Sequence, residues 1–216
     1  MNINYKNYFK RHYKYSFQER DIENYKKWFY AQWKIINYFI ARKKYKSCLE
    51  IGSGIGGFYQ FVEAIIPHYK GVELDRAATK FSNAYWKSNC FFNTPFEKIS
   101  HEKFDLIVAF EVLEHLENPN KSISKIYSLL KNKGMFVGTS PFPFAKNVRN
   151  DVTHLSVLHP ENWKRLFLLN GFKKVILLPM SFVPFLWRIN KRFNIRIPLY
   201  LPFPAFVSTC LIIAWK

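Results

Sequence analysis

Two patterns of apolar positions divide the chain near residue 47. Before it, from Asp21 to about Arg42, apolar residues recur every three or four positions. This spacing predicts one amphipathic helix, with Asp21 as its N-cap and with polar residues such as Gln32 turned away from the apolar face. Beyond residue 47, short apolar runs alternate with helical stretches. That alternation predicts an α/β fold in which parallel strands are joined by crossover helices.

The α/β part of the chain divides into short segments. The apolar runs predict strands at residues 47–51, 69–74, 90–92, 104–110, 135–139, 173–178 and 206–215. The stretches between them predict helices at residues 58–66, 77–87, 121–130 and 161–169. In such a fold, ligands bind beyond the carboxyl ends of the strands, where the first strand meets its glycine-rich turn.

The first strand leads directly into the turn Glu50-Ile51-Gly52-Ser53-Gly54-Ile55-Gly56-Gly57. Glycines at such a turn let a ligand touch backbone N–H groups at the start of the next helix. The letters fit both a dinucleotide pattern, through Gly57, and a methyltransferase pattern, through Glu50 and Gly56. Glu73, at the end of the second strand, would accept hydrogen bonds from ribose hydroxyls in either case. The turn alone therefore leaves a nicotinamide-dependent oxidoreductase as an alternative.

The net charge of +18 is concentrated at the two ends of the chain. Residues 1–47 carry 12 basic against 3 acidic residues and residues 162–216 carry 9 against none, whereas residues 48–161 are balanced at 12 against 12. Such flanks would meet an anionic membrane surface or a nucleic acid, although a compositional bias toward lysine is an alternative explanation. Three scattered cysteines and the lack of an apolar leader run predict a cytoplasmic protein without disulfides.

A second motif follows the strand at residues 104–110, where the sequence reads Glu111-Val112-Leu113-Glu114-His115. Together with the glycine turn, residues 71–75 and residues 134–141, it resembles class I S-adenosylmethionine-dependent methyltransferases. Within them it resembles the branch of ubiquinone-biosynthesis O-methyltransferases, and the resemblance covers residues 47–178. It implies a Rossmann-like sheet, mostly parallel with a C-terminal antiparallel hairpin and with helices on both faces. It also implies S-adenosyl-L-methionine as the cofactor.

The resemblance assigns a set of residues to the cofactor: Glu50, Gly52, Ser53, Gly54, Gly56, Glu73, Leu74, Phe96 and Phe110. One feature departs from the family, which often has an acidic residue after the third strand to bind the adenine amino group. Here the segment reads Asn93-Thr94-Pro95-Phe96, without an acid. We therefore expect Phe96 and backbone groups to hold the adenine.

The second motif supplies the candidates for catalysis. A hydroxyl acceptor needs a base or a metal to remove or polarise its proton. Glu111, Glu114 and His115 fall on one face if a helical turn begins there, and in the ubiquinone-type relatives this group is associated with a divalent metal, Mg or Zn. Alternatively, His115 acts as a base without a metal, or His154 is the base. His154 could equally be a loop residue bonded to Asp151.

The acceptor is expected to be a small, glycan or lipid-linked molecule, methylated at oxygen. Adenine amino-group methyltransferases carry an Asn- or Asp-Pro-Pro-aromatic motif where this chain reads Ala109-Phe110-Glu111-Val112. Cytosine carbon methylation needs a cysteine nucleophile, and the three cysteines fall away from the carboxyl ends of the strands. An RNA methyltransferase or RNA-binding protein that uses the basic flanks remains the alternative.

The flanks also suggest a domain organisation. We expect residues 1–46 to form a basic, aromatic, helical cap and residues 47–216 the methyltransferase domain, with an insertion at about residues 179–205. This insertion is rich in aromatic, basic and proline residues, among them Trp187, Arg188 and Pro198. Prolines argue against a spanning helix, and the composition suits interfacial contact with the inner face of a membrane. A lid over the acceptor pocket is the alternative.

Overall fold

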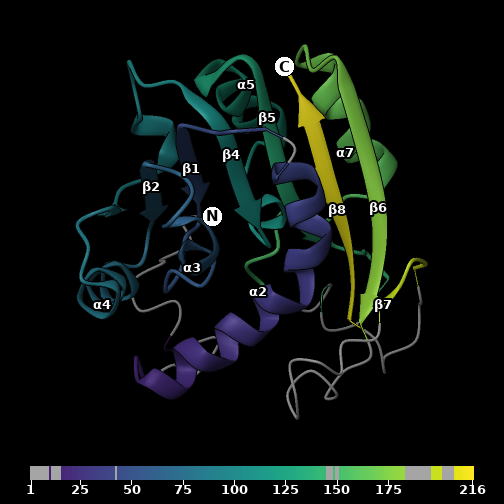
Figure 1. The fold of residues 1–216 in the computed structure, drawn as a ribbon. Coiled ribbons are helices and arrows are strands. Elements are labelled where there is room, and N and C mark those ends of the chain that lie inside the picture. The colour runs from purple at the N-terminus through teal and green to yellow at the C-terminus, as the bar shows by residue number, and fades with distance from the viewer. Residues whose placement is uncertain are drawn as a thin grey trace. The chain divides into compact units, whose positions relative to one another are not determined.

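The computed structural model describes residues 10, 16–41, 43–144, 148, 151–182, 196–200 and 207–216. The chain forms two compact units, which are residues Met1–Ile99 and Ser100–Lys216. Each unit has its own set of strands and helices, and together they contain the elements of the expected α/β fold (Figure 1).

The sheet of the first unit consists of three parallel strands. They are β1 (Ser47–Ile51), β2 (His68–Glu73) and β3 (Phe91–Asn93), with β2 in the middle. All five residues of β1 are buried. Ile51 is in register with Val72, and Glu73 is in register with Asn93. The carboxyl ends of the three strands therefore meet at one edge, where the glycine turn begins.

Helix α2 (Glu19–Ile40) precedes the first strand, as predicted. Its apolar positions at spacings of three and four are buried, and they include Ile22, Phe29, Ile36 and Ile40. The predicted N-cap was wrong, because the cap residue is Gln18 and Asp21 occupies the third helical position. The Asp21 carboxylate instead accepts hydrogen bonds from the backbone N–H groups of Ser16 and Gln18. This is the acidic half of a capping box, which satisfies donors at the helix start.

Two other predictions in this unit need correction. The helix expected at residues 58–66 is a single turn, α3 (Tyr59–Val62). Pro67 disfavours the helical conformation for Ile66 and so explains why no helix extends beyond that point, although α3 already ends at Val62. Gln32 was predicted to face away from the apolar side of α2, yet its side chain is completely buried. The unit is completed by α4 (Arg76–Trp86) and the short 3₁₀ helix η1 (Phe96–Lys98).

The second unit contains the antiparallel part of the fold. Strands β4 (Phe104–Phe110) and β5 (Leu130–Pro141) are parallel, and β8 (Val207–Trp215) pairs antiparallel with β5. Strand β6 (Lys174–Phe182) then pairs antiparallel with β8 on its other side. Figure 1 shows β5, β8 and β6 side by side. The expected mostly parallel Rossmann-like sheet with a C-terminal antiparallel hairpin is confirmed.

The second unit's helices are α5 (Pro119–Leu129), α7 (Pro160–Leu169) and the 3₁₀ helix η2 (Leu113–His115). Phe167 of α7 packs on Phe136 of β5, with ring centroids 4.9 Å apart. Helix α7 ends at Asn170, and Gly171 follows with a φ of 96°. A left-handed residue just after a helix is the usual reason for a glycine there, so the predicted helix end is confirmed.

The expected insertion at residues 179–205 is only partly described. Its first residues belong to β6, which continues to Phe182, and a two-residue strand β7 (Arg196–Ile197) pairs with that end. Trp187 and Arg188, on which the prediction of interfacial contact depends, lie outside the described residues. Within the described parts of the chain, no helix is long and apolar enough to span a membrane.

Candidate active site

The glycine turn has a backbone conformation that only glycine adopts without strain. Gly52, Gly54 and Gly56 all have positive φ, at 66°, 54° and 78°. The N–H groups of Gly52 and Ser53 both donate to the Val72 carbonyl of β2. These bonds fix the turn at the carboxyl edge of the sheet, which is where the sequence predicted a ligand.

Glu73 connects the end of β2 to this turn. Its Oε2 accepts from Gly54 N–H at 3.0 Å, and its Oε1 accepts from Leu74 and Asp75 N–H. Burial raises the pKa of Glu73, and these backbone hydrogen bonds oppose the rise. A carboxylate offers about four acceptor sites, so Glu73 keeps capacity for a ligand hydroxyl. Asp75 differs, because its side chain caps α4 by accepting from Ala77 and Ala78 N–H.

The last residue of β3 provides a polar contact where an acid is missing. The Asn93 side-chain amide donates to the carbonyls of Glu73 and Leu74, at 3.0 and 2.9 Å. It thereby fixes the backbone after β2, while the Leu74 side chain is 44% exposed. Phe96, which was predicted to hold the adenine, is almost completely buried in η1. Of these two apolar residues, Leu74 is the one accessible to a ligand.

Glu50 lies near the end of β1, two residues before the first glycine of the turn, and its carboxyl group is buried. Its exposed fraction is 1%, and it accepts a hydrogen bond from the Tyr69 hydroxyl. Burial raises the pKa of Glu50 to about 8, and the nearby Glu73 carboxylate adds to the rise, whereas the Tyr69 hydrogen bond opposes it. At neutral pH the Glu50 carboxyl is therefore mostly protonated in the absence of a cation.

This raised pKa predicts a pH-dependent stability. A folded-state pKa above the unfolded value of 4.5 means that folding favours the protonated carboxyl. The resulting stabilisation is complete below that unfolded value and is lost as the pH rises through about 8. Between these limits, the wild type should lose up to about 1.4 kcal/mol of unfolding free energy per pH unit relative to Glu50→Gln. Urea denaturation of both proteins across this range measures the difference, and a constant difference would contradict the prediction.

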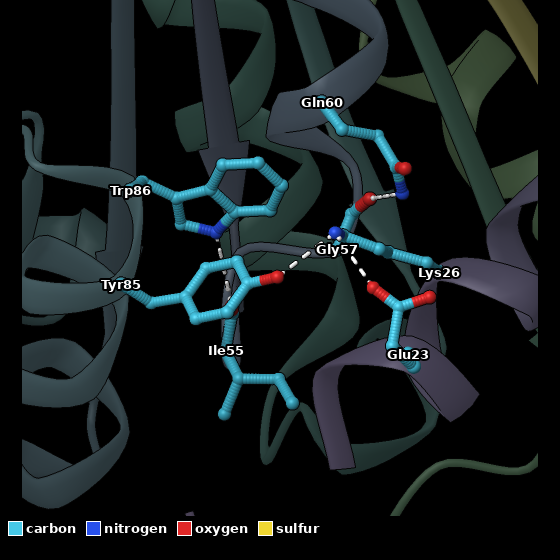
Figure 2. A network of polar contacts seen from close by, with 7 residues as sticks. All are labelled: Glu23, Lys26, Ile55, Gly57, Gln60, Tyr85 and Trp86. Carbon is cyan, nitrogen blue, oxygen red and sulfur yellow. Dashed lines mark hydrogen bonds and ion pairs between the residues drawn. The ribbon is translucent and has the colours of Figure 1, made fainter. Parts of the chain in front are cut away.

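Helix α2 contacts the glycine turn through a network that the sequence did not reveal. Figure 2 shows the Lys26 ammonium between the Glu23 carboxylate and the Tyr85 hydroxyl, each 2.9 Å away. The neighbouring Trp86 ring donates its N–H to the Ile55 carbonyl within the turn. Partial burial would lower the pKa of Lys26, but the hydrogen bonds to Tyr85 and Glu23 outweigh it and raise that pKa.

The network holds α2, α4 and the turn together in the first unit. Lys26 also lies 5.1 Å from the ring centroids of both Tyr85 and Trp86, in cation–π contact. Gln60 supports the turn from the side of α3, since its amide donates to the Gly57 carbonyl at 2.7 Å. Lys26 and Tyr85 are 59 residues apart in the sequence, which is why periodicity alone could not pair them.

In the second unit, Phe110 ends β4 and is nearly buried, and Glu111 follows it with a φ of 53°. The Glu111 N–H donates to the carbonyl and hydroxyl oxygens of Thr139 near the end of β5. The Oε1 atom of Glu111 accepts from the Thr209 hydroxyl at 2.9 Å. Burial raises the pKa of Glu111, and the hydrogen bonds to Thr139 and Thr209 oppose the rise. A positive φ in a residue other than glycine is uncommon and is found preferentially at functional sites.

Glu114 and His115 of η2 form a cluster with His154. One potential ligand atom from each lies within 4.8 Å of the others, and the two imidazole rings are 4.9 Å apart. The Glu114 side chain is 1% exposed, and its Oε2 has no hydrogen-bond partner among the described residues. Burial and the neighbouring Glu111 raise the pKa of Glu114 well above its ordinary value. The predicted set of metal ligands was Glu111, Glu114 and His115. The cluster in the structure differs in one residue, because it contains His154 instead of Glu111.

Backbone carbonyls orient both imidazoles. His115 Nδ1 lies 2.9 Å from the Thr153 carbonyl, and His154 Nδ1 lies 2.7 Å from the Val148 carbonyl. Because a carbonyl oxygen only accepts, both Nδ1 atoms carry protons and both Nε2 atoms are the basic nitrogens. His154 also lies 3.8 Å from the Asp151 carboxylate. This contact is made by His154 Nε2, so both interpretations of His154, as a base and as a partner of Asp151, involve the same nitrogen.

Comparisons with known proteins agree with this fold. A family model described as a methyltransferase domain matches residues 20–177. A methyltransferase structure from Archaeoglobus fulgidus, described as S-adenosylmethionine-dependent, aligns with a TM-score of 0.68 at 21% identity, covering 88% of this chain and 94% of that one. Among curated protein sequences, none matches significantly.

Two further structural neighbours carry cofactor ligands. Phosphoethanolamine N-methyltransferase 2 from Haemonchus contortus, in complex with S-adenosyl-L-methionine, aligns with a TM-score of 0.66 at 14% identity, covering 99% of this chain and 60% of that one. NodS, an N-methyltransferase from Bradyrhizobium japonicum WM9 bound to S-adenosyl-L-homocysteine, aligns with a TM-score of 0.61 at 14% identity, covering 85% and 84%. The alternatives of a nicotinamide oxidoreductase and an RNA-directed protein gain no support from these matches.

Proposed function

Because this chain belongs to the methyltransferase-domain family and is a class I S-adenosylmethionine-dependent methyltransferase, we propose that it methylates an oxygen atom. The acceptor is a small, glycan or lipid-linked hydroxyl compound. The observation that carries the proposal is the pair of oriented imidazoles, His115 and His154. A hydroxyl needs a base to become a nucleophile at neutral pH. The resemblance to ubiquinone-biosynthesis O-methyltransferases also favours oxygen.

The first unit has the features that a nucleoside cofactor needs. S-adenosyl-L-methionine, when bound, supplies a methyl group on a sulfonium that is a good leaving group. Ser53 has a buried hydroxyl with no hydrogen-bond partner among the described residues, so it is available to a ligand at the turn. Glu73 would accept from the ribose hydroxyls, and exposed Leu74 would contact the adenine. Glu50, the glycines at 52, 54 and 56, and Phe96 complete the proposed site in this unit. Phe110, which belongs to the second unit, remains a prediction from the family resemblance.

The histidines of the second unit would act on the acceptor. An imidazole with its proton fixed on Nδ1 presents Nε2 to take the hydroxyl proton. If His154 accepts that proton, the nearby Asp151 carboxylate stabilises the resulting imidazolium. Holding the oxygen close to the methyl carbon and in line with it would supply a large part of the rate enhancement. Glu111, fixed by Thr139 and Thr209, would position the acceptor through its carboxylate.

A divalent metal at the cluster of Glu114, His115 and His154 is the second candidate. The unpartnered Glu114 oxygen and two imidazoles with basic Nε2 atoms form a donor set that suits Zn more than Mg. A cation there would also stabilise the ionised form of Glu114, which burial otherwise opposes. Bound metal would polarise the acceptor hydroxyl and so take over part of the base's role.

The flanks extend the proposal to the location of the acceptor. We propose that residues 1–46 cap the methyltransferase domain of residues 47–216, and that the basic segment at about 179–205 contacts an anionic surface. A peripheral position on the inner face of a membrane would bring a lipid-linked acceptor to the enzyme. The support is the charge distribution, since residues 162–216 contain nine basic residues and no acidic one.

Pairs of acceptors that differ only in the reacting atom would test the choice of oxygen. We expect methyl transfer to phenols and sugar hydroxyls at least about tenfold faster than to the matching anilines and amino sugars, since removal of the hydroxyl proton by a positioned histidine creates a much stronger nucleophile at oxygen. Labelled methyl transfer measures both rates. Equal or faster transfer to the amines would contradict O-methylation. In the same assay, inhibition by a chelator and recovery with Zn or Mg would support the metal, and full activity in chelator would exclude it.

A further inference from the structure

Gln32 is a polar residue whose side chain is buried in the described part of the chain. Its side chain is 0% exposed, and neither Oε1 nor Nε2 has a hydrogen-bond partner among the described residues. Burying an amide without partners costs stability, so such groups are rare in folded proteins. Where one persists, a ligand or water that completes its hydrogen bonds is the usual explanation.

The position of Gln32 connects it with the glycine turn. A Cβ atom on Gly57 would lie 2.4 Å from the Tyr25 ring and 2.8 Å from the Phe29 ring, so this face of α2 packs directly on the turn. Gln32 follows Phe29 by three residues and Tyr25 by seven, spacings that place it on the same helix face. The unpartnered amide is therefore on the side of α2 that meets the cofactor turn.

We propose that Gln32 binds the amino-acid end of S-adenosyl-L-methionine. The nucleoside end is assigned to Glu73 and Leu74 at the end of β2, so the amino-acid end must use other groups around the turn. It carries an ammonium and a carboxylate, and a glutamine amide offers one acceptor and one donor group. A neutral amide is also cheaper to bury than a charged side chain while the site is empty. This inference rests on the cofactor role of the turn.

Two ligands separate this role from a general effect on the fold. S-adenosylhomocysteine carries the amino-acid end, whereas 5′-methylthioadenosine has the same nucleoside and thioether without it. Gln32→Met should raise the dissociation constant of S-adenosylhomocysteine about tenfold, as expected for losing hydrogen bonds to charged groups. The dissociation constant of 5′-methylthioadenosine should stay unchanged. Isothermal titration calorimetry measures both values.

The free protein provides a second readout. Because Met removes an unsatisfied amide at similar volume, the Gln32→Met protein without ligand should melt at a higher temperature than the wild type. If the Gln32 amide had hydrogen-bond partners in the folded protein, Gln32→Met would instead lower the melting temperature. Gln32→Leu repeats the test with another apolar side chain, in case Met packs poorly.

Gln60→Met is the matched control, because Gln60 contacts the same turn but already donates to the Gly57 carbonyl (Figure 2). It should change the affinities for the two ligands by the same factor. Equal losses for both ligands in Gln32→Met, or no loss for either, would overturn the proposal. If the glycine turn does not bind the cofactor at all, the wild type would bind neither S-adenosylhomocysteine nor 5′-methylthioadenosine, which is a different result.

Discussion

S-adenosylhomocysteine at a hundred times its dissociation constant should raise the unfolding free energy of the wild type by about 2.7 kcal/mol, and Gly54→Ala should remove most of this gain. Gly54 has a φ of 54° in the turn that we propose binds the ligand. The added methyl group would occupy the space in which the ligand approaches the backbone. If the dissociation constant rises a hundredfold, the stabilisation at the same concentration falls to about 0.4 kcal/mol.

The control for this variant is a glycine with a similar backbone but no ligand. Gly171→Ala, at a φ of 96° after α7, should also cost about 1–2 kcal/mol of stability through left-handed strain. Its response to S-adenosylhomocysteine should equal that of the wild type. Denaturation with and without ligand measures both effects. A full ligand response in Gly54→Ala, or a response of the wild type to NADH, would refute the assignment of the turn.

Buried strands were the most predictable part of the fold. The runs at residues 47–51 and 104–110 became β1 and β4 with the same bounds, because every residue of β1 and nearly all of β4 lie in the core. Sequence periodicity works where burial follows hydrophobicity. It was wrong at Gln32, whose polar side chain gives no sign that it is buried. It was also wrong for α3, which is only one turn long although the apolar spacing predicted a helix up to residue 66.

The sequence predicted the individual motifs of the candidate site, but not which of their residues contact one another. The glycine turn, Glu73 and the motif from Glu111 to His115 are local patterns, and each could be placed at a strand end. The position of His154 beside His115 depends on the contacts of His154 with Val148 and Asp151. Similarly, the pairing of Lys26 with Tyr85 depends on how α2 packs on α4. Contacts between residues so distant in sequence follow from tertiary packing, which periodicity does not contain.

Replacement of His115 or His154 should cause a large loss of activity. His154→Ala and His115→Ala should each lower kcat about 100- to 10,000-fold, the usual range for removing a general base or its close partner. The affinity for S-adenosylhomocysteine should change less than about twofold, because the residues proposed to bind the cofactor belong to the turn and to β2. Steady-state kinetics and calorimetry on the same preparations measure the two quantities.

Two further variants show which histidine takes the proton. His68→Ala serves as the control, since His68 is exposed at the start of β2 and should keep full activity. His154→Gln and His115→Gln keep a polar group but cannot accept a proton at neutral pH. The base should therefore lose as much activity with Gln as with Ala, whereas a histidine that only positions the acceptor or its partner should recover part of its kcat with Gln. Full activity in both alanine variants would show that neither imidazole is the base, and parallel losses in kcat and cofactor affinity would show a structural role instead.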